Sequence, residues 1–150
     1  MLYFCGIGFD PSICVLPALG RLAEEYEPRG AVFLAIHNAE REPEEVRKQF
    51  RKVLALKGAL LPFAVDQMRV KFHARGVTAD RYGQKMMPPF VVIVDRTGKI
   101  AFHSESATGD ANVNAIVRQQ MAAGSLDMDE EQANERIERA LRREIERVLK

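Results

Sequence analysis

The stretch LYFCGIGFDPSICVLPALGRLAEEY, residues 2–26, decides the fold. It opens with a short apolar segment and passes through a loop containing glycine and proline. Apolar side chains then recur at helical spacing, at Leu16, Leu19, Leu22 and Tyr26. We therefore predict a strand, a tight turn and a helix. At such a turn the free N–H groups and the positive dipole end of the helix lower the pKa of a thiol.

The same stretch resembles the thioredoxin superfamily, and most closely its TlpA-like or redoxin branch. Without a gap, Phe4 takes the place of the family's strand phenylalanine, and Pro17 that of the proline five residues beyond the second active-site cysteine. LPALGRLAEEY is similar to the family's first long helix. The Cys-x-Pro-Cys box then falls on Phe9, Asp10, Pro11 and Ser12. The resemblance implies a thiol-disulfide oxidoreductase fold whose box keeps its proline and has lost both cysteines.

The next part of the chain alternates strand and helix patterns. We predict a buried strand at Ala31 to His37, a helix from Pro43 to the stop at Gly58, a short strand at Pro62 to Asp66 and a helical turn at Met68 to Phe72. A hairpin follows, with strands at Pro89 to Val94 and Lys99 to His103 around the DRTG turn, and then a closing helix at Ala111 to Met121.

The hairpin carries a second part of the resemblance. YGQKMMPPFVVIVDRTGKI, residues 82–100, is similar to the family's YGVxxxPTTFLIDxxGxI stretch with one residue inserted. Pro89 then takes the place of the cis-proline that faces the active-site box. The resemblance implies that Met87, Pro88 and Pro89 bind the substrate.

The predicted fold class is α/β: a thioredoxin-like fold, with a central mixed β-sheet flanked by helices and an extra C-terminal amphipathic helix. We assign residues 1–124 to the thioredoxin-like domain and 125–150 to the added helix, which Asp127 or Asp129 can cap. Its apolar stripe consists of Ala133, Ile137, Ala140, Leu141, Ile145, Val148 and Leu149, and its charged i, i+4 pairs are Glu135–Arg139, Glu138–Arg142 and Glu146–Lys150. We expect the stripe to pack on the same domain, with docking to a partner as the alternative.

Cys14 and Cys5 are the candidate catalytic residues. We expect Cys14 within the first turn of the helix, where its thiol would be acidified; burial as a small apolar side chain is the alternative. Cys5 stands where the family has a tryptophan, and core packing is its alternative. A disulfide between them needs Cα atoms within about 7 Å, which sequence leaves open. Ser12 is expected to cap the helix, together with Asp10.

Metal sites receive little support from the sequence. His37, His73 and His103 form no i, i+4 pair and have no Cys at ligand spacing, so we predict no structural zinc. We assign no residue as a metal ligand and no cofactor. DPSIC also resembles the CPDVC box of Sco-type copper chaperones, with Asp10 and Cys14 on its two cysteines. Copper handling, with Met86 and Met87 as soft donors, is therefore a third functional hypothesis.

Composition narrows the class of protein. The 150 residues are 47% hydrophobic, enough for one compact domain, and a net charge of +1 without a basic block gives no sign of nucleic-acid binding. The apolar runs are too short to cross a bilayer. A strand starting at residue 2 leaves no room for the first strand of TlpA-like proteins, so we expect a piece of a longer chain or a minimal version. Its compartment is unknown, and an extracytoplasmic location is implied only if a longer precursor exists.

The functional prediction combines resemblance and residues. The resemblance implies a protein or peptide thiol or disulfide as partner. The residues indicate a divergent TlpA/redoxin-type protein without a dithiol site, with at most a single-thiol activity through Cys14, because resolution of a mixed disulfide requires a second thiol. The alternative is a redox-inactive module that holds an extended peptide beside Pro89.

Overall fold

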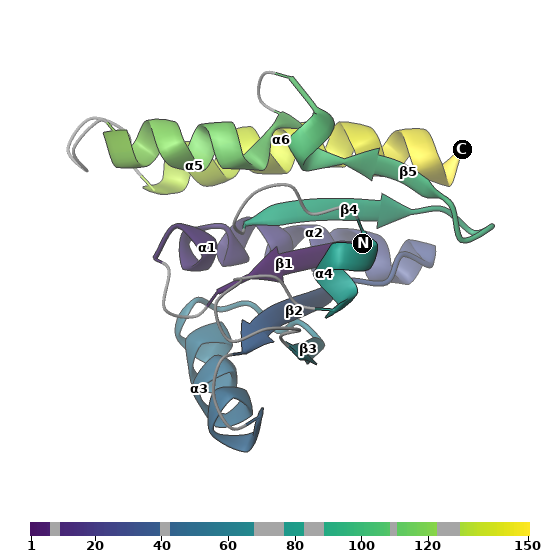
Figure 1. The fold of residues 1–150 in the computed structure, drawn as a ribbon. Coiled ribbons are helices and arrows are strands. Elements are labelled where there is room, and N and C mark those ends of the chain that lie inside the picture. The colour runs from purple at the N-terminus through teal and green to yellow at the C-terminus, as the bar shows by residue number, and fades with distance from the viewer. Residues whose placement is uncertain (7–9, 40–42, 68–76, 83–88, 109–110, 123–129) are drawn as a thin grey trace.

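A computed structural model describes residues 1–6, 10–39, 43–67, 77–82, 89–108, 111–122 and 130–150. Its strands are β1 (Leu2–Cys5), β2 (Leu34–Ala39), β3 (Phe63–Gln67), β4 (Phe90–Val94) and β5 (Ile100–His103). Its α-helices are α1 (Asp10–Cys14), α2 (Leu16–Tyr26), α3 (Pro43–Leu56), α4 (Val77–Arg81), α5 (Val113–Ala122) and α6 (Glu130–Leu149) (Figure 1). Short 3₁₀ turns, η1 (Glu27–Arg29) and η2 (Ser104–Ser106), follow α2 and β5.

The strands form one mixed sheet in the order β3-β2-β1-β4-β5. β1 and β2 are parallel, as are β2 and β3, whereas β4 runs antiparallel to both β1 and β5. The predicted α/β class with a central mixed sheet is confirmed, and β1 is its middle strand.

The second strand begins later than predicted, at Leu34 instead of Ala31. Gly30 adopts a left-handed conformation (φ 88°), and the Ala31 N–H bonds back to the Tyr26 carbonyl. These residues therefore belong to the turn that leaves α2. Val32, 72% exposed, lies outside the sheet.

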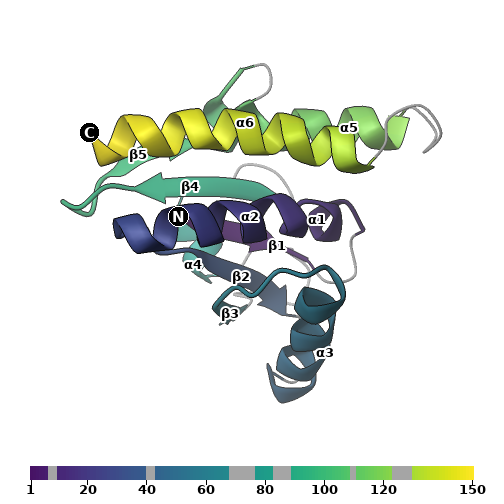
Figure 2. The same cartoon turned by 180° about the vertical axis from the view of Figure 1, so that it is seen from behind.

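Helices cover opposite faces of the sheet. α2 lies on one face and α4 on the other, as the two opposite views show (Figures 1 and 2). Side chains alternate along β1 accordingly: Tyr3 and Cys5 pack in the cluster that contains α2, and Phe4 packs in the cluster that contains Ala79 of α4.

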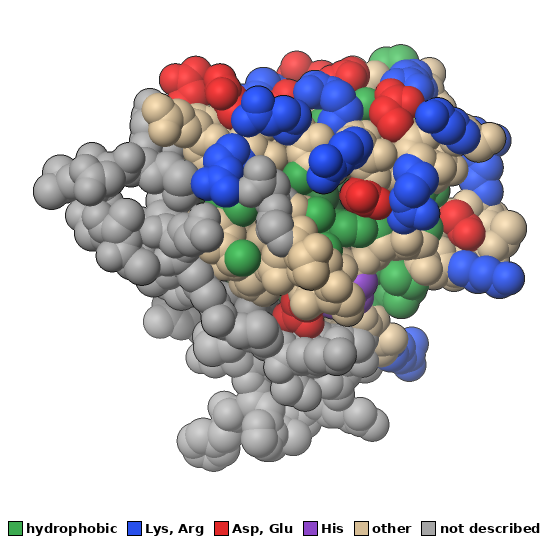
Figure 3. Space-filling model, turned by 90° about the horizontal axis from the view of Figure 1, so that it is seen from above, with side chains coloured by type: hydrophobic (Ala, Val, Ile, Leu, Met, Phe, Trp, Pro, Cys, Tyr) green, Lys and Arg blue, Asp and Glu red, His purple; other side chains and the backbone are tan. Residues whose placement is uncertain are grey.

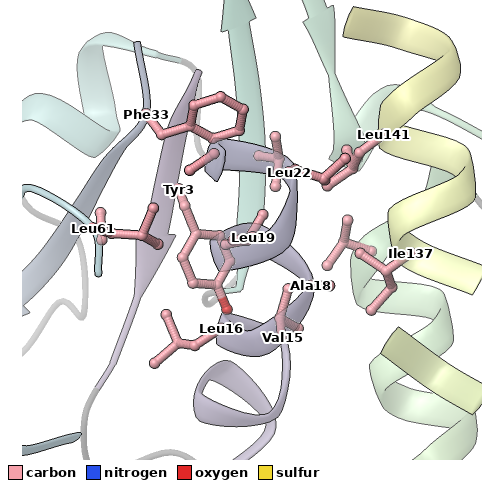
Figure 4. Close-up of a cluster of buried hydrophobic side chains, with 14 of the residues drawn as sticks. Tyr3, Val15, Leu16, Ala18, Leu19, Leu22, Phe33, Leu61, Ile137 and Leu141 are labelled. Carbon is pink, nitrogen blue, oxygen red and sulfur yellow. The ribbon is translucent and has the colours of Figure 1, made fainter. Parts of the chain in front are cut away.

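The predicted apolar face of α2 is fully buried between the sheet and α6 (Figure 4). Gly20 allows a close approach on this helix, because a Cβ atom there would lie 3.2 Å from the Cα atom of Ala59. The four positions whose periodicity predicted the helix, Leu16, Leu19, Leu22 and Tyr26, are thus all buried.

The β4–β5 hairpin forms as predicted, and the Asp95 carboxylate holds its turn. Asp95 Oδ1 accepts hydrogen bonds from the Thr97 and Lys99 N–H groups, and Gly98 supplies a positive φ of 83°. The closing helix starts at Val113 instead of Ala111 because Asn112 caps it, with Oδ1 accepting from the Ala115 N–H group at 3.0 Å.

α6 packs against α2 and α5. The apolar side chains at the contact are buried: Ala133, Ile137, Ala140, Leu141 and Ile145. The Glu138–Arg142 pair is present, whereas Glu146 pairs with Arg29 of η1. The boundary at residues 124 and 125 falls outside the described residues, so that division stays a prediction.

The surface above α5 and α6 carries basic and acidic side chains interspersed with one another (Figure 3). Arg139, Arg143 and Glu135 of α6 are exposed on the outside. None of the described helices has the length and apolar composition needed to span a bilayer.

Candidate functional site

The candidate site lies at the junction between α1 and α2, where the helix breaks. Pro17 has no N–H group to continue the helical ladder, and the Leu19 N–H bonds to the carbonyl of Val15, the N-cap of α2. Cys14 is therefore the last residue of α1. The expectation that Cys14 lies within the first turn of the helix with Leu16 to Tyr26 on its apolar face is wrong, because α1 ends at Cys14 and α2 begins at Leu16.

The expectation that Ser12 caps a helix is also wrong. Ser12 is 1% exposed, and its Oγ atom has no hydrogen-bond partner. The residue lies inside α1, which starts two positions earlier, so its side chain is not at the cap position. Of the other box positions, Phe9 lies outside the described residues, while Asp10 and Pro11 are the first two residues of α1.

A hydrogen bond that the sequence did not reveal ties this turn to the sheet. The Tyr3 hydroxyl donates to the Ser12 carbonyl at 2.6 Å, and both residues are buried. Burial raises the pKa of the Tyr3 phenol, with further contributions from the charges of Cys5 and Cys14. Tyr3 thus joins β1, which carries Cys5, to α1, which carries Cys14.

The two thiols differ in access. Cys5 is 2% exposed, its Sγ atom lies 3.6 Å from the Ile36 carbonyl oxygen, and burial raises the pKa of its thiol. Core packing, the alternative weighed for Cys5, describes what is observed. Cys14 is partly exposed, and neither cysteine is in a disulfide.

Pro89 lies next to the end of β1. Phe4 pairs with Phe90 in the antiparallel register, and their rings stack with centroids 4.3 Å apart. One step beyond this pair stand Cys5 and the buried Pro89. The structure therefore brings Cys5 and Pro89 to the end of the sheet that the resemblance indicated. Met86, Met87 and Pro88 lie outside the described residues, so the cis bond before Pro89 stays a prediction.

The described histidines make structural contacts. His37 Nδ1 lies 3.2 Å from the Cys5 carbonyl oxygen. His103 Nε2 lies 2.9 Å from the Tyr82 carbonyl oxygen, and its Nδ1 accepts from the Glu105 N–H group at 3.3 Å. Within the described ranges, no three His, Cys, Asp or Glu side chains are grouped so as to hold a metal ion. His73 lies outside these ranges.

His37 gives a testable pH dependence. Burial lowers the pKa of its imidazole below the usual 6.5. Below pH 6.5 the unfolded chain therefore binds a proton that the folded chain refuses, and stability falls as pH falls. One proton changes the free energy of unfolding by at most about 1.4 kcal/mol per pH unit. We expect the free energy of unfolding, measured with urea between pH 7.5 and 5, to fall less steeply with falling pH in His37→Gln than in the parent. An equal dependence on pH in the two proteins would contradict this.

Comparison with known proteins supports the fold. No protein-family model and no curated protein matches the chain. Among solved structures, a candidate thiol:disulfide interchange protein DsbE from Chlorobium tepidum is similar, with 24% sequence identity and a TM-score of 0.55. The match covers 81% of this chain and 77% of that chain. Together with the strand order and the helix at the end of β1, this likeness shows that the chain has a thioredoxin-like fold.

Proposed function

We propose that this chain is a divergent relative of thiol-disulfide oxidoreductases that has lost dithiol chemistry and offers a single thiol, Cys14, to a protein or peptide partner. The observation that carries the proposal is the contrast between a partly exposed Cys14 at the α1–α2 junction and a buried Cys5. The similar solved structure is that of a candidate thiol:disulfide interchange protein, which supports the same class of chemistry.

The reaction of one thiol is limited to exchange. The Cys14 thiolate attacks one sulfur of a partner disulfide, the partner's S–S bond breaks, and the partner's other sulfur leaves as a thiolate. The product is a mixed disulfide. Cys5 is poorly suited to resolve it, because burial keeps that thiol protonated and out of reach. An external thiol such as glutathione must attack the mixed disulfide and free one of the two sulfurs.

The partner is expected to bind in extended form beside Pro89. In this proposal the backbone of Met87, Pro88 and Pro89 receives the peptide. Pro89 is the member of this group that the structure describes, and it adjoins Phe90, which pairs with Phe4.

The second candidate is a redox-inactive binding module that uses the same residues. It is favoured by the box positions, where Phe9 and Ser12 replace both cysteines and the Ser12 side chain is buried. In that case Cys14 serves packing alone, and partner binding should be insensitive to oxidants and reductants.

Alkylation tests the proposal. We expect one thiol per folded chain to react with iodoacetamide, at a rate that rises with pH, in the parent and in Cys5→Ala but not in Cys14→Ser. With excess oxidised glutathione, the same thiol should form one mixed disulfide per chain, measured by mass. If Cys14 reacts no faster than Cys5 in the folded protein, the exchange proposal fails and the binding module is favoured.

A further inference from the structure

A side chain from α6 accepts a hydrogen bond from an N–H group at the amino end of α2. Val15 at the N-cap supplies no side-chain acceptor, and Pro17 has no N–H group. The Ala18 N–H group donates instead to Asn134 Oδ1 at 3.3 Å. Cys14 directly precedes Val15, the N-cap of α2, and Ala18 is the third residue of α2, so this contact is made at the end of α2 that follows the candidate thiol.

Asn134 is fixed in orientation. The residue is 3% exposed, and its Nδ2 group donates to the Glu130 carbonyl at 2.8 Å. A buried amide is unfavourable unless both of its ends are hydrogen-bonded. Here both ends have partners, and one of them belongs to α2. Asn134 therefore forms a hydrogen bond with α2 that an apolar side chain at this buried position could not form.

Contacts farther along the two helices hold Asn134 in register. Three ion pairs follow the Ala18–Asn134 contact: Arg21 with Glu138, Glu25 with Arg142, and Arg29 of η1 with Glu146. Each pair is separated by 116 or 117 residues, so the helices run parallel at a constant offset. A slide of α6 along α2 would break all four contacts, which means that the amino end of α2 is coupled to the whole of α6.

We propose that Asn134 is a positioning residue for Cys14, acting through the amino end of α2. The inference rests on the proposed function of Cys14. The amide oxygen carries a partial negative charge and lies against the Ala18 N–H group at the positive end of α2. It therefore weakens the positive potential that would favour a thiolate. It also fixes the α1–α2 junction on which Cys14 lies. α6 would then set the reactivity of the thiol as well as the stability of the fold.

Three variants of the full chain separate positioning from stability. Asn134→Asp puts a full negative charge at the amino end of α2, Asn134→Ala removes the acceptor, and Ile137→Val removes one methyl group from the same turn of α6. We expect the midpoint of the Cys14 alkylation rate against pH to rise in Asn134→Asp, to fall in Asn134→Ala and to stay unchanged in Ile137→Val. Identical midpoints in all variants would overturn the proposal. If Asn134→Ala does not fold, the other two variants carry the comparison.

A second measurement keeps this test independent of the proposed function. If Cys14 of the parent does not react at any pH, the exchange function fails, and amide hydrogen exchange at Ala18 then decides the positioning role. Loss of protection at Ala18 in Asn134→Ala, with protection kept in Ile137→Val, supports the control of the α2 end by Asn134. Equal protection in both variants overturns it.

Discussion

Ending the chain at Asp129, and so removing α6, is expected to take away most of the stability of the domain. Ile137, Leu141 and Ile145 are buried against the rest of the chain. Burial of each such side chain contributes about 1.5–3 kcal/mol, whereas a whole domain is stable by about 5–15 kcal/mol. The deletion also uncovers the faces of α2 and α5. We expect the cooperative thermal transition of the parent to be lost and a hydrophobic dye to bind at neutral pH.

A point variant gives the same test in the full chain. Leu141 is fully buried, and Leu141→Ala should lower the free energy of unfolding by about 2–5 kcal/mol. The matched control is Arg139→Ala on the exposed side of the same helix, for which we expect a change within about 0.5 kcal/mol. An unchanged melting temperature after removal of α6 would mean that the helix does not pack on this domain in solution.

Restoring two cysteines to the box is the second large effect that we expect. In the ungapped register Phe9 and Ser12 take the two cysteine positions of the box, so Phe9→Cys with Ser12→Cys places two thiols three residues apart, the spacing of a small disulfide ring. Ser12 is buried and its Oγ atom has no hydrogen-bond partner among the described residues, so Ser12→Cys removes no hydrogen bond of the parent. Because a dithiol resolves its own mixed disulfide, we expect at least about a tenfold faster turnover of insulin reduction than in the parent.

The controls for this repair distinguish the activity of the two new thiols from that of Cys14. The double variant is made in a Cys14→Ser background, and each single variant, Phe9→Cys or Ser12→Cys, should show almost no turnover. Asp10 is expected to blunt the gain, since a neighbouring carboxylate raises the pKa of a thiol. Robust turnover by the unmodified chain, abolished by Cys14→Ser, would show that the register is wrong and that Cys14 is the working residue.

Local patterns predicted most of the fold. The periodicity of residues 16–26 and 133–145 marked the buried faces of α2 and α6, and the DRTG turn marked the hairpin. These features are readable because burial on one face leaves a period in the sequence. The ends of elements were predicted less accurately. β2 and α5 begin a few residues later than predicted, because Gly30 forms a turn before β2 and Asn112 caps α5.

The candidate site was less readable. The resemblance predicted that the box containing Ser12 faces Pro89. In the structure Ser12 lies in α1, and Pro89 directly precedes Phe90, which pairs with Phe4 of β1. The prediction from sequence missed the break at Val15, although Pro17 gave a signal for it, and it assigned a capping role to a serine that is buried inside α1.

The sequence by itself determined the α/β class, the β4–β5 hairpin and the amphipathic character of the last helix, since each follows from residues close together in the chain. Tertiary structure alone decided the environment of the thiols. Tyr3 reaches Ser12 across nine residues, and Asn134 reaches Ala18 across 116. Burial and hydrogen-bond partners set the protonation and access of a thiol, and these are supplied by segments that no local pattern connects.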